Sequence, residues 1–184
     1  MLKKWKLISS TQVFNAAPYI TIDQRKYLLP NGSKGDSYFH LNRPDFVLIV
    51  AVNENNQFLL IKQYRRGVDD HVIEVPAGWI DKQETPQQAA QRELLEETGY
   101  QAKEIIPLGE IYAMPSFSSI KAFIFLAKIA NRPDQEIATE ADENLTSRLF
   151  TREKLVKMIA ENKIKSMAGL SALNLAFHEI NRAE

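Results

Sequence analysis

Three glutamates stand close together in the middle of the chain, at Glu93, Glu96 and Glu97. In a helix, at about 100° per residue, they fall within about 100° of arc and share one face. Carboxylates this close repel one another unless a positive charge lies among them. Two interpretations account for the pattern. One is a solvated acidic face relieved by a base such as the neighbouring Arg92; the other is a site for a hard divalent cation, which prefers oxygen ligands.

The residues around these glutamates predict the helix that must position them. Thr85-Pro86 is typical of a helix start, with the threonine as cap and the proline at the first helical position. Gly99 is typical of a helix end. Leu94 and Leu95 lie outside the carboxylate arc, where we expect the helix to pack against a core.

The spacing around this helix resembles a known motif. From Gly78 to Tyr100 the sequence reads GWIDKQETPQQAAQRELLEETGY. It resembles the Nudix box, Gly-x5-Glu-x7-Arg-Glu-apolar-x-Glu-Glu-x-Gly-apolar, at every defined position. The resemblance implies a hydrolase of the α/β class, a Nudix α/β/α sandwich with a mixed sheet. It also implies that Mg²⁺, or alternatively Mn²⁺, is held by Glu93, Glu96, Glu97 and the backbone carbonyl of Ala77.

Segments outside the box resemble the branch of the family that acts on ADP-ribose and other nucleoside diphosphate sugars. Gln63-Tyr64-Arg65 resembles the segment whose arginine holds the diphosphate or the terminal sugar, although an exposed loop arginine is the alternative. Pro115 lies sixteen residues beyond Gly99, as in enzymes acting on ADP-ribose, and Met114 before it is a candidate substrate contact. The residues after Pro115 lack the acidic side chains of that branch, so strict ADP-ribose specificity is not implied.

The resemblance also implies an N-terminal substrate contact and a general base. Lys4-Trp5 resembles a pair that stacks adenine, often across a dimer; Trp5 packing between the N-terminal strands and the core is the alternative. Within the acidic segment 134–144, the resemblance implies a general base that acts on the attacking water. Glu143 fits best because it directly precedes an apolar run, with Glu140 and Asp142 as competitors. Glu96 and Glu97 complete the candidate catalytic set.

The composition of the chain limits its binding partners, its cysteine chemistry and its location. The chain of 184 residues is 45% hydrophobic and has 23 basic and 23 acidic residues, so its charge gives no indication of nucleic acid or membrane binding. It contains no cysteine, which excludes thiolate sites and disulfides. Neither a signal-peptide pattern nor an apolar run of membrane-spanning length occurs, and we expect a cytoplasmic protein.

Two parts are predicted along the chain. Residues 1–44 alternate polar and apolar positions between turn signals, which predicts a small antiparallel N-terminal sheet for substrate and dimer contacts. Residues 45–184 form the predicted Nudix domain. Its first core strand, residues 46–52, is continuously apolar and should be buried on both faces. Helices are expected over about 151–160 and 166–181.

The predicted function is Mg²⁺-dependent hydrolysis of the diphosphate bridge of a nucleoside diphosphate sugar such as ADP-ribose or GDP-mannose, by a homodimer. One alternative is a Nudix enzyme for nucleoside triphosphates or dinucleoside polyphosphates. Another is a module that senses a nucleotide sugar without hydrolysing it. Both are disfavoured: the first by the N-terminal strands, Arg65 and Pro115, the second because every box carboxylate is present.

Overall fold

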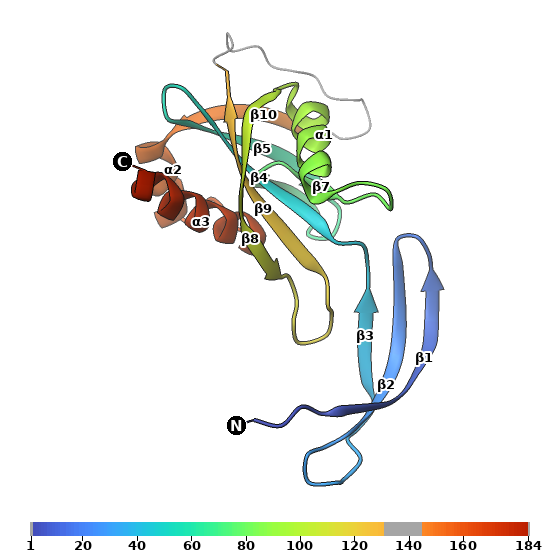
Figure 1. Cartoon of the computed structure of the whole chain (residues 1–184). Coiled ribbons are helices and arrows are strands. Elements are labelled where there is room, and N and C mark those ends of the chain that lie inside the picture. The colour runs from blue at the N-terminus through green and yellow to red at the C-terminus, as the bar shows by residue number, and fades with distance from the viewer. Residues whose placement is uncertain (1, 131–144, 184) are drawn as a thin grey trace. The chain divides into compact units, whose positions relative to one another are not determined.

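The computed structural model describes residues 2–130 and 145–183, and the chain divides into two compact units (Figure 1). One unit comprises Met1–Asp45 and Tyr112–Lys121; the other comprises Phe46–Ile111 and Ala122–Glu184. We describe each by itself. The assignment of residues 1–44 and 45–184 to two functional domains stays a prediction.

The first unit is built on a three-stranded antiparallel sheet of order β1-β2-β3. Its strands are β1 (Lys6–Ala16), β2 (Ile20–Leu28) and β3 (Tyr38–Asn42). The segment 112–121 joins this unit by two hydrogen bonds to Leu41. The Leu41 backbone N–H donates to the carbonyl of Phe117 at 2.8 Å, and the Ser118 hydroxyl donates to the Leu41 carbonyl at 2.8 Å. The N-terminal antiparallel sheet that the sequence predicts is therefore present.

The second unit contains a seven-stranded sheet. Its main order is β10-β5-β4-β9-β8, while β6 pairs with β5 and β7 with β4. β4 is parallel to β9 and antiparallel to β5, so the sheet is mixed. The strands are β4 (Phe46–Asn53), β5 (Gln57–Arg65), β6 (Asp70–Glu74), β7 (Ala77–Trp79), β8 (Ala102–Tyr112), β9 (Lys121–Ile129) and β10 (Leu145–Thr151).

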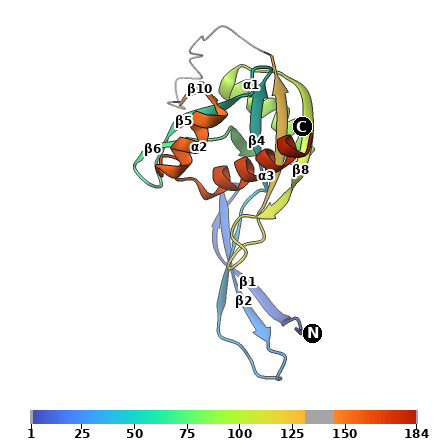
Figure 2. The ribbon, with the colours of Figure 1, turned by 90° about the vertical axis from the view of Figure 1, so that its left-hand side faces the viewer.

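Helices cover both faces of this sheet. α1 (Pro86–Thr98) lies on one face, and α2 (Arg152–Ala160) and α3 (Met167–Ala183) lie on the other (Figure 2). The predicted α/β/α sandwich is confirmed. Among the described residues, none of these helices combines the length and apolar character that a membrane crossing requires.

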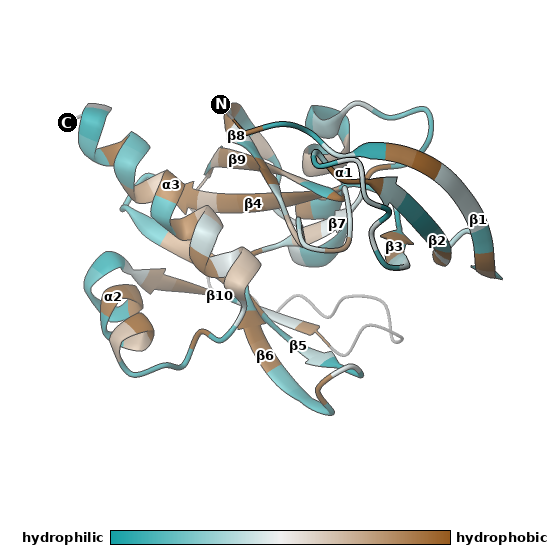
Figure 3. Ribbon diagram, turned by 90° about the horizontal axis from the view of Figure 1, so that it is seen from below, coloured by the Kyte–Doolittle hydropathy of each residue, from teal (hydrophilic) through white to brown (hydrophobic). Residues whose placement is uncertain are grey.

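Alternation along β4 divides the core into two clusters. Val47, Ile49 and Ala51 pack with Ala89, Ala90 and Leu94 of α1. Leu48, Val50 and Val52 pack with residues of α2 and α3, among them Leu155 and Leu173. The strand is apolar from Phe46 to Val52 (Figure 3) because successive side chains point to opposite faces that are both buried.

Candidate functional site

The helix that carries the three glutamates begins and ends as its sequence predicts. The Thr85 hydroxyl accepts from the backbone N–H of Gln88 at 3.3 Å, and the Gln88 side chain accepts from the backbone N–H of Thr85 at 2.9 Å, which together form a capping box. Gly99 ends the helix with φ 64°, a left-handed conformation in which glycine has no Cβ to clash. These caps fix which helical face the carboxylates occupy.

Glu97 is held at the contact between α1 and β7. Leu94, one turn earlier, is fully buried in the core and anchors the helix against β4. The Glu97 side chain is only 5% exposed, and its Oε2 accepts from the backbone N–H of Ala77 at 2.9 Å. A buried carboxylate is costly unless its charge is compensated, so this position requires a donor or a cation nearby.

Glu93 lies against the next residue of the same backbone. A Cβ placed on Gly78 would come within 1.9 Å of the Glu93 carboxyl carbon and of one carboxylate oxygen. The carboxylate therefore occupies the space that any side chain at position 78 would fill. Since Gly78 follows Ala77, the carboxylates of Glu93 and Glu97 converge on two adjacent residues of β7.

Arg92 organises the remaining carboxylates. Its Nε and Nη2 donate to the two oxygens of Glu84, each at 2.9 Å, and Nη2 also donates to the Trp79 carbonyl at 2.9 Å. Its Nη1 donates to Glu93 at 2.7 Å and to Glu96 at 3.0 Å. The hydrogen bonds that Glu84 accepts from Arg92 lower the pKa of Glu84 and raise the pKa of Arg92. The two-pronged pair with Glu84 braces the loop that precedes α1.

These residues suit a hard cation. In the described ranges 2–130 and 145–183, no three acidic or imidazole side chains by themselves surround a point suited to a metal ion. A cation here would therefore need the backbone oxygen that the sequence resemblance implies at Ala77, together with Glu93 and Glu97. The fit rests on the convergence of two carboxylates on the Ala77-Gly78 backbone, an oxygen-rich donor set that Mg²⁺ and Mn²⁺ accept. Glu96 is 58% exposed and shares Arg92 with Glu93.

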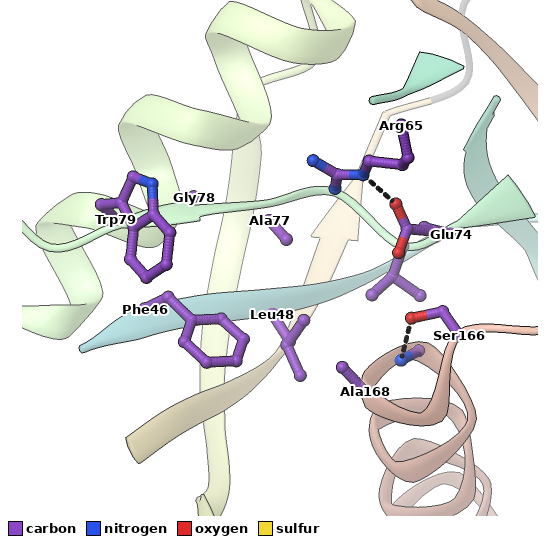
Figure 4. Close-up of a pocket in the computed structure, with 11 residues that line it drawn as sticks. Phe46, Leu48, Arg65, Glu74, Ala77, Gly78, Trp79, Ser166 and Ala168 are labelled. Carbon is purple, nitrogen blue, oxygen red and sulfur yellow. Dashed lines mark hydrogen bonds and ion pairs between the residues drawn. The ribbon is translucent and has the colours of Figure 1, made fainter. Parts of the chain in front are cut away.

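A cavity of about 200 Å³ lies beside this backbone (Figure 4). Trp79 and Phe46 line one end, with ring centroids 5.8 Å apart in an edge arrangement. The ion pair of Arg65 and Glu74 lies at the other end. The full lining is Phe46, Leu48, Arg65, Glu74, Val75, Ala77, Gly78, Trp79, Ser166, Ala168 and Gly169.

Comparison with known proteins decides the family. The NUDIX domain profile matches residues 42–170. This chain belongs to the Nudix family. The match spans β4 to the start of α3 and includes every residue of the carboxylate site, so the predicted family of hydrolases is confirmed.

Individual relatives of this Nudix protein extend over most of its length. It is 29% identical over 159 residues to the ADP-ribose pyrophosphatase of Bacillus subtilis (strain 168), covering 86% of this chain and 85% of the relative. It is 28% identical over 161 residues to the methanol dehydrogenase activator of Bacillus methanolicus, with the same coverage of 86% and 85%. A crystal structure described as an ADP compounds hydrolase superposes with a TM-score of 0.85 at 22% identity, covering 100% of this chain and 97% of that one, which establishes the fold.

The structure places Arg65 in this Nudix domain at the edge of the cavity, 42% exposed, and gives it a partner that the sequence analysis did not assign. Its Nε donates to Glu74 at 2.6 Å. The strand pairing alone would not have given this partner, because the β5–β6 register places Asp70 opposite Arg65 and Ile61 opposite Glu74. Arg65 is thus held in place while part of it remains exposed to the cavity.

The remaining candidates are not among the described residues of the second unit. Trp5 belongs to the first unit, is 59% exposed and meets Tyr27 edge-on at 6.4 Å between ring centroids. Met114 belongs to the same unit, and its carbonyl accepts from the backbone N–H groups of Phe117 at 3.1 Å and Ser118 at 2.9 Å. Glu143, with its competitors Glu140 and Asp142, lies outside the described residues. The roles of all these residues stay predictions.

Glu84→Gln should destabilise the protein by about 1–2 kcal/mol, because it removes the charged partner of Arg92 in a partly buried pair. The folded-state pKa of Glu84 is lowered, so its contribution is complete above the ordinary glutamate pKa and is lost as pH falls through the lowered value. Thermal unfolding in the presence of chelator, from neutral to acidic pH, measures this. The exposed Glu104→Gln is the control. A melting difference between wild type and Glu84→Gln that stays constant into the acid would contradict the assignment.

Proposed function

We propose that this protein hydrolyses the diphosphate bridge of nucleoside diphosphate sugars, with a divalent cation, Mg²⁺ or alternatively Mn²⁺. The observation that carries the proposal is the convergence of Glu93 and Glu97 on the Ala77-Gly78 backbone beside a cavity that Arg65 lines. The similarity to an ADP-ribose pyrophosphatase over most of both chains supports this substrate class. It does not choose among ADP-ribose, GDP-mannose and related compounds.

The cation would be held by Glu93, Glu96, Glu97 and the Ala77 carbonyl. Such an ion, when bound, would offset the negative charge of the diphosphate, which otherwise repels an incoming nucleophile. The chain supplies the rigidity for this task. Because Arg92 bonds Glu84, Glu93 and Glu96 at once, the carboxylates cannot separate without breaking several charged hydrogen bonds.

The remaining steps are assigned to side chains of the protein. In our proposal Glu143 takes a proton from water, and the water oxygen forms a bond to one phosphorus of the bridge. The bond from that phosphorus to the bridging oxygen breaks, and the products are a nucleoside monophosphate and a sugar phosphate. Arg65, whose fork of donors suits phosphate oxygens, holds the part of the substrate that does not react.

We also propose that the protein acts as a homodimer in which Trp5 and Met114 contact substrate. The support is the first unit, where β1 leaves large apolar side chains about half exposed, among them Leu7 at 47%, Val13 at 51% and Phe14 at 50%. Exposed apolar surface on a long edge strand is typical of a protein interface. Light scattering of the purified protein would show twice the mass of the 21.0 kDa chain.

The experiment that tests the proposal is product analysis over a panel of substrates. ADP-ribose, GDP-mannose, other nucleoside diphosphate sugars, nucleoside triphosphates and dinucleoside polyphosphates are incubated with the enzyme and Mg²⁺, and the products are separated by chromatography. We expect a nucleoside monophosphate and a sugar phosphate from the diphosphate sugars and no turnover of triphosphates. Preferred cleavage of triphosphates would overturn the proposal in favour of the other Nudix class.

Arg65→Gln should raise the KM for the diphosphate sugar about tenfold or more while changing kcat less, because the arginine binds a part of the substrate that does not react. Steady-state kinetics on the best substrate of the panel measures both constants. Arg66→Gln is the matched control, since Arg66 is exposed, adjacent and outside the cavity lining. Equal effects of the two substitutions, or a loss confined to kcat, would contradict the role given to Arg65.

A further inference from the structure

A second and larger cavity, of about 750 Å³, lies between the β5–β6 hairpin and the segment that joins α2 to α3. None of the box glutamates lines it. It shares three lining residues with the smaller cavity, namely Arg65, Glu74 and Ser166. Its full lining is Lys62, Arg65, Val68, Asp70, His71, Val72, Ile73, Glu74, Asn162, Lys163, Lys165 and Ser166.

Lys62 stands where the core pattern of β5 would place an apolar residue. Phe58 and Leu60 precede it at intervals of two and face the cluster formed with α2 and α3. Side chains two apart share a face, so Lys62 continues this row toward the helical side of the sheet. It pairs in register with Ile73, which packs against the same cluster. The apolar row therefore ends in an ammonium group at the wall of the cavity.

Lys163 and Lys165 approach the cavity from the opposite wall. They flank Ile164, which is 1% exposed and anchors the α2–α3 segment in the core. With Ile164 turned inward, both lysines remain exposed. Lys163 is paired with Glu161 at 2.6 Å, whereas Lys62 and Lys165 have no ion pair within the described part of the chain.

The charges of the cavity do not balance, although the whole chain is neutral. Four lining side chains are basic and two are acidic. Both acids are already engaged: Asp70 accepts from the backbone N–H of His71 at 2.7 Å, and Glu74 accepts from Arg65. Ser166 directly precedes the 17-residue α3 and lines the cavity. The N-terminus of a helix favours negative charge because its backbone N–H groups point outward.

We infer that this cavity binds the phosphate group of a phosphorylated small molecule, a phosphomonoester, with Lys62 and Lys165 as the principal cationic contacts. A cavity lined by four basic side chains and only two acidic ones suits a compact, doubly charged anion. Val68, Val72 and Ile73 provide apolar surface for the carbon skeleton of the ligand. The volume is within the range of ordinary small-molecule sites.

Binding in the absence of divalent cations tests this inference independently of hydrolysis. Isothermal titration calorimetry with inorganic phosphate and with glucose 6-phosphate is performed in chelator on the full chain, on Lys62→Gln, on Lys165→Gln and on the double variant. We expect saturable binding to the wild type, tighter for the sugar phosphate, and a Kd raised about tenfold or more in the double variant. Lys154→Gln, an exposed lysine of α2 outside the lining, should bind as the wild type does.

A further titration identifies which kind of molecule carries the phosphate group. The titration is repeated in chelator with a saturating nucleoside diphosphate sugar present. Competition would assign the cavity to a phosphorylated end or product of the substrate, and simultaneous binding would assign it to a separate phosphorylated metabolite. The inference is overturned if the wild type shows no saturable binding of either probe. It is equally overturned if the double variant retains wild-type affinity while its thermal unfolding shows that it is folded.

Discussion

Glu97→Gln should reduce hydrolysis of the best nucleoside diphosphate sugar by about a thousandfold or more, while the variant remains folded. The glutamine preserves the shape of the side chain and can still accept the Ala77 N–H bond, but it removes the negative charge that a cation requires. The effect should lie mainly in kcat, since the diphosphate must be neutralised for reaction more than for binding. Steady-state kinetics and circular dichroism on the same preparation measure both parts of the prediction.

The outcome is informative because Glu97 is buried. Glutamine keeps the size of the side chain and the bond from the Ala77 N–H, so the substitution changes the charge of a buried site without opening a cavity. Near-normal turnover in Glu97→Gln would remove this residue from the metal site. Loss of activity together with loss of the fold would assign it to structure alone. Glu104→Gln, on the exposed side of β8, serves as the neutral control.

Gly78→Ala should abolish most of the activity, by about a hundredfold or more, with only a small change in stability. The new methyl group would occupy the position of the Glu93 carboxylate, which lies within 1.9 Å of it. That carboxylate is the far end of a flexible side chain, so it can move aside, and the backbone of Gly78 does not require glycine. The movement withdraws one of the two converging carboxylates from the Ala77-Gly78 backbone.

Gly67→Ala is a matched control for this substitution. A Cβ at Gly67 meets no atom within 4 Å, so the same change of residue tests only the loss of glycine. Kinetics and thermal unfolding of the two variants should show full activity for Gly67→Ala and a folded, inactive Gly78→Ala. If Gly78→Ala keeps wild-type activity, the position of Glu93 against β7 is not needed for catalysis.

Much of the fold could be predicted because local and global signals agree. The caps at Thr85 and Gly99 fix α1, and the unbroken apolar run of β4 reflects a strand buried on both faces. The sequence predicts the antiparallel sheet of the first unit but not the lengths of its strands. β2 runs unbroken from Ile20 to Leu28, because pairing with β1 and β3 continues through its polar residues. Tertiary hydrogen bonding overrides local propensity there.

The candidate site could be predicted only in part, for a physical reason. The positions of the carboxylates follow from helical spacing. Of the two leucines expected to pack against the core, Leu94 is buried, whereas Leu95 is 42% exposed. The Glu74 partner of Arg65 does not follow even from the hairpin register, which places Asp70 opposite Arg65. The lysines of the larger cavity lie about a hundred residues apart, so only the folded chain brings them together.

The most direct test of the central claim is the hydrolysis of ADP-ribose by the wild-type protein with Mg²⁺, followed by chelation and then by restoration of the metal. We predict release of a nucleoside monophosphate and a sugar phosphate, loss of turnover on chelation, and recovery when Mg²⁺ is returned. Turnover that continues in chelator would contradict a cation at Glu93 and Glu97. Binding of ADP-ribose and of every other diphosphate sugar without turnover of any would mean that this Nudix domain senses nucleotide sugars instead of cleaving them.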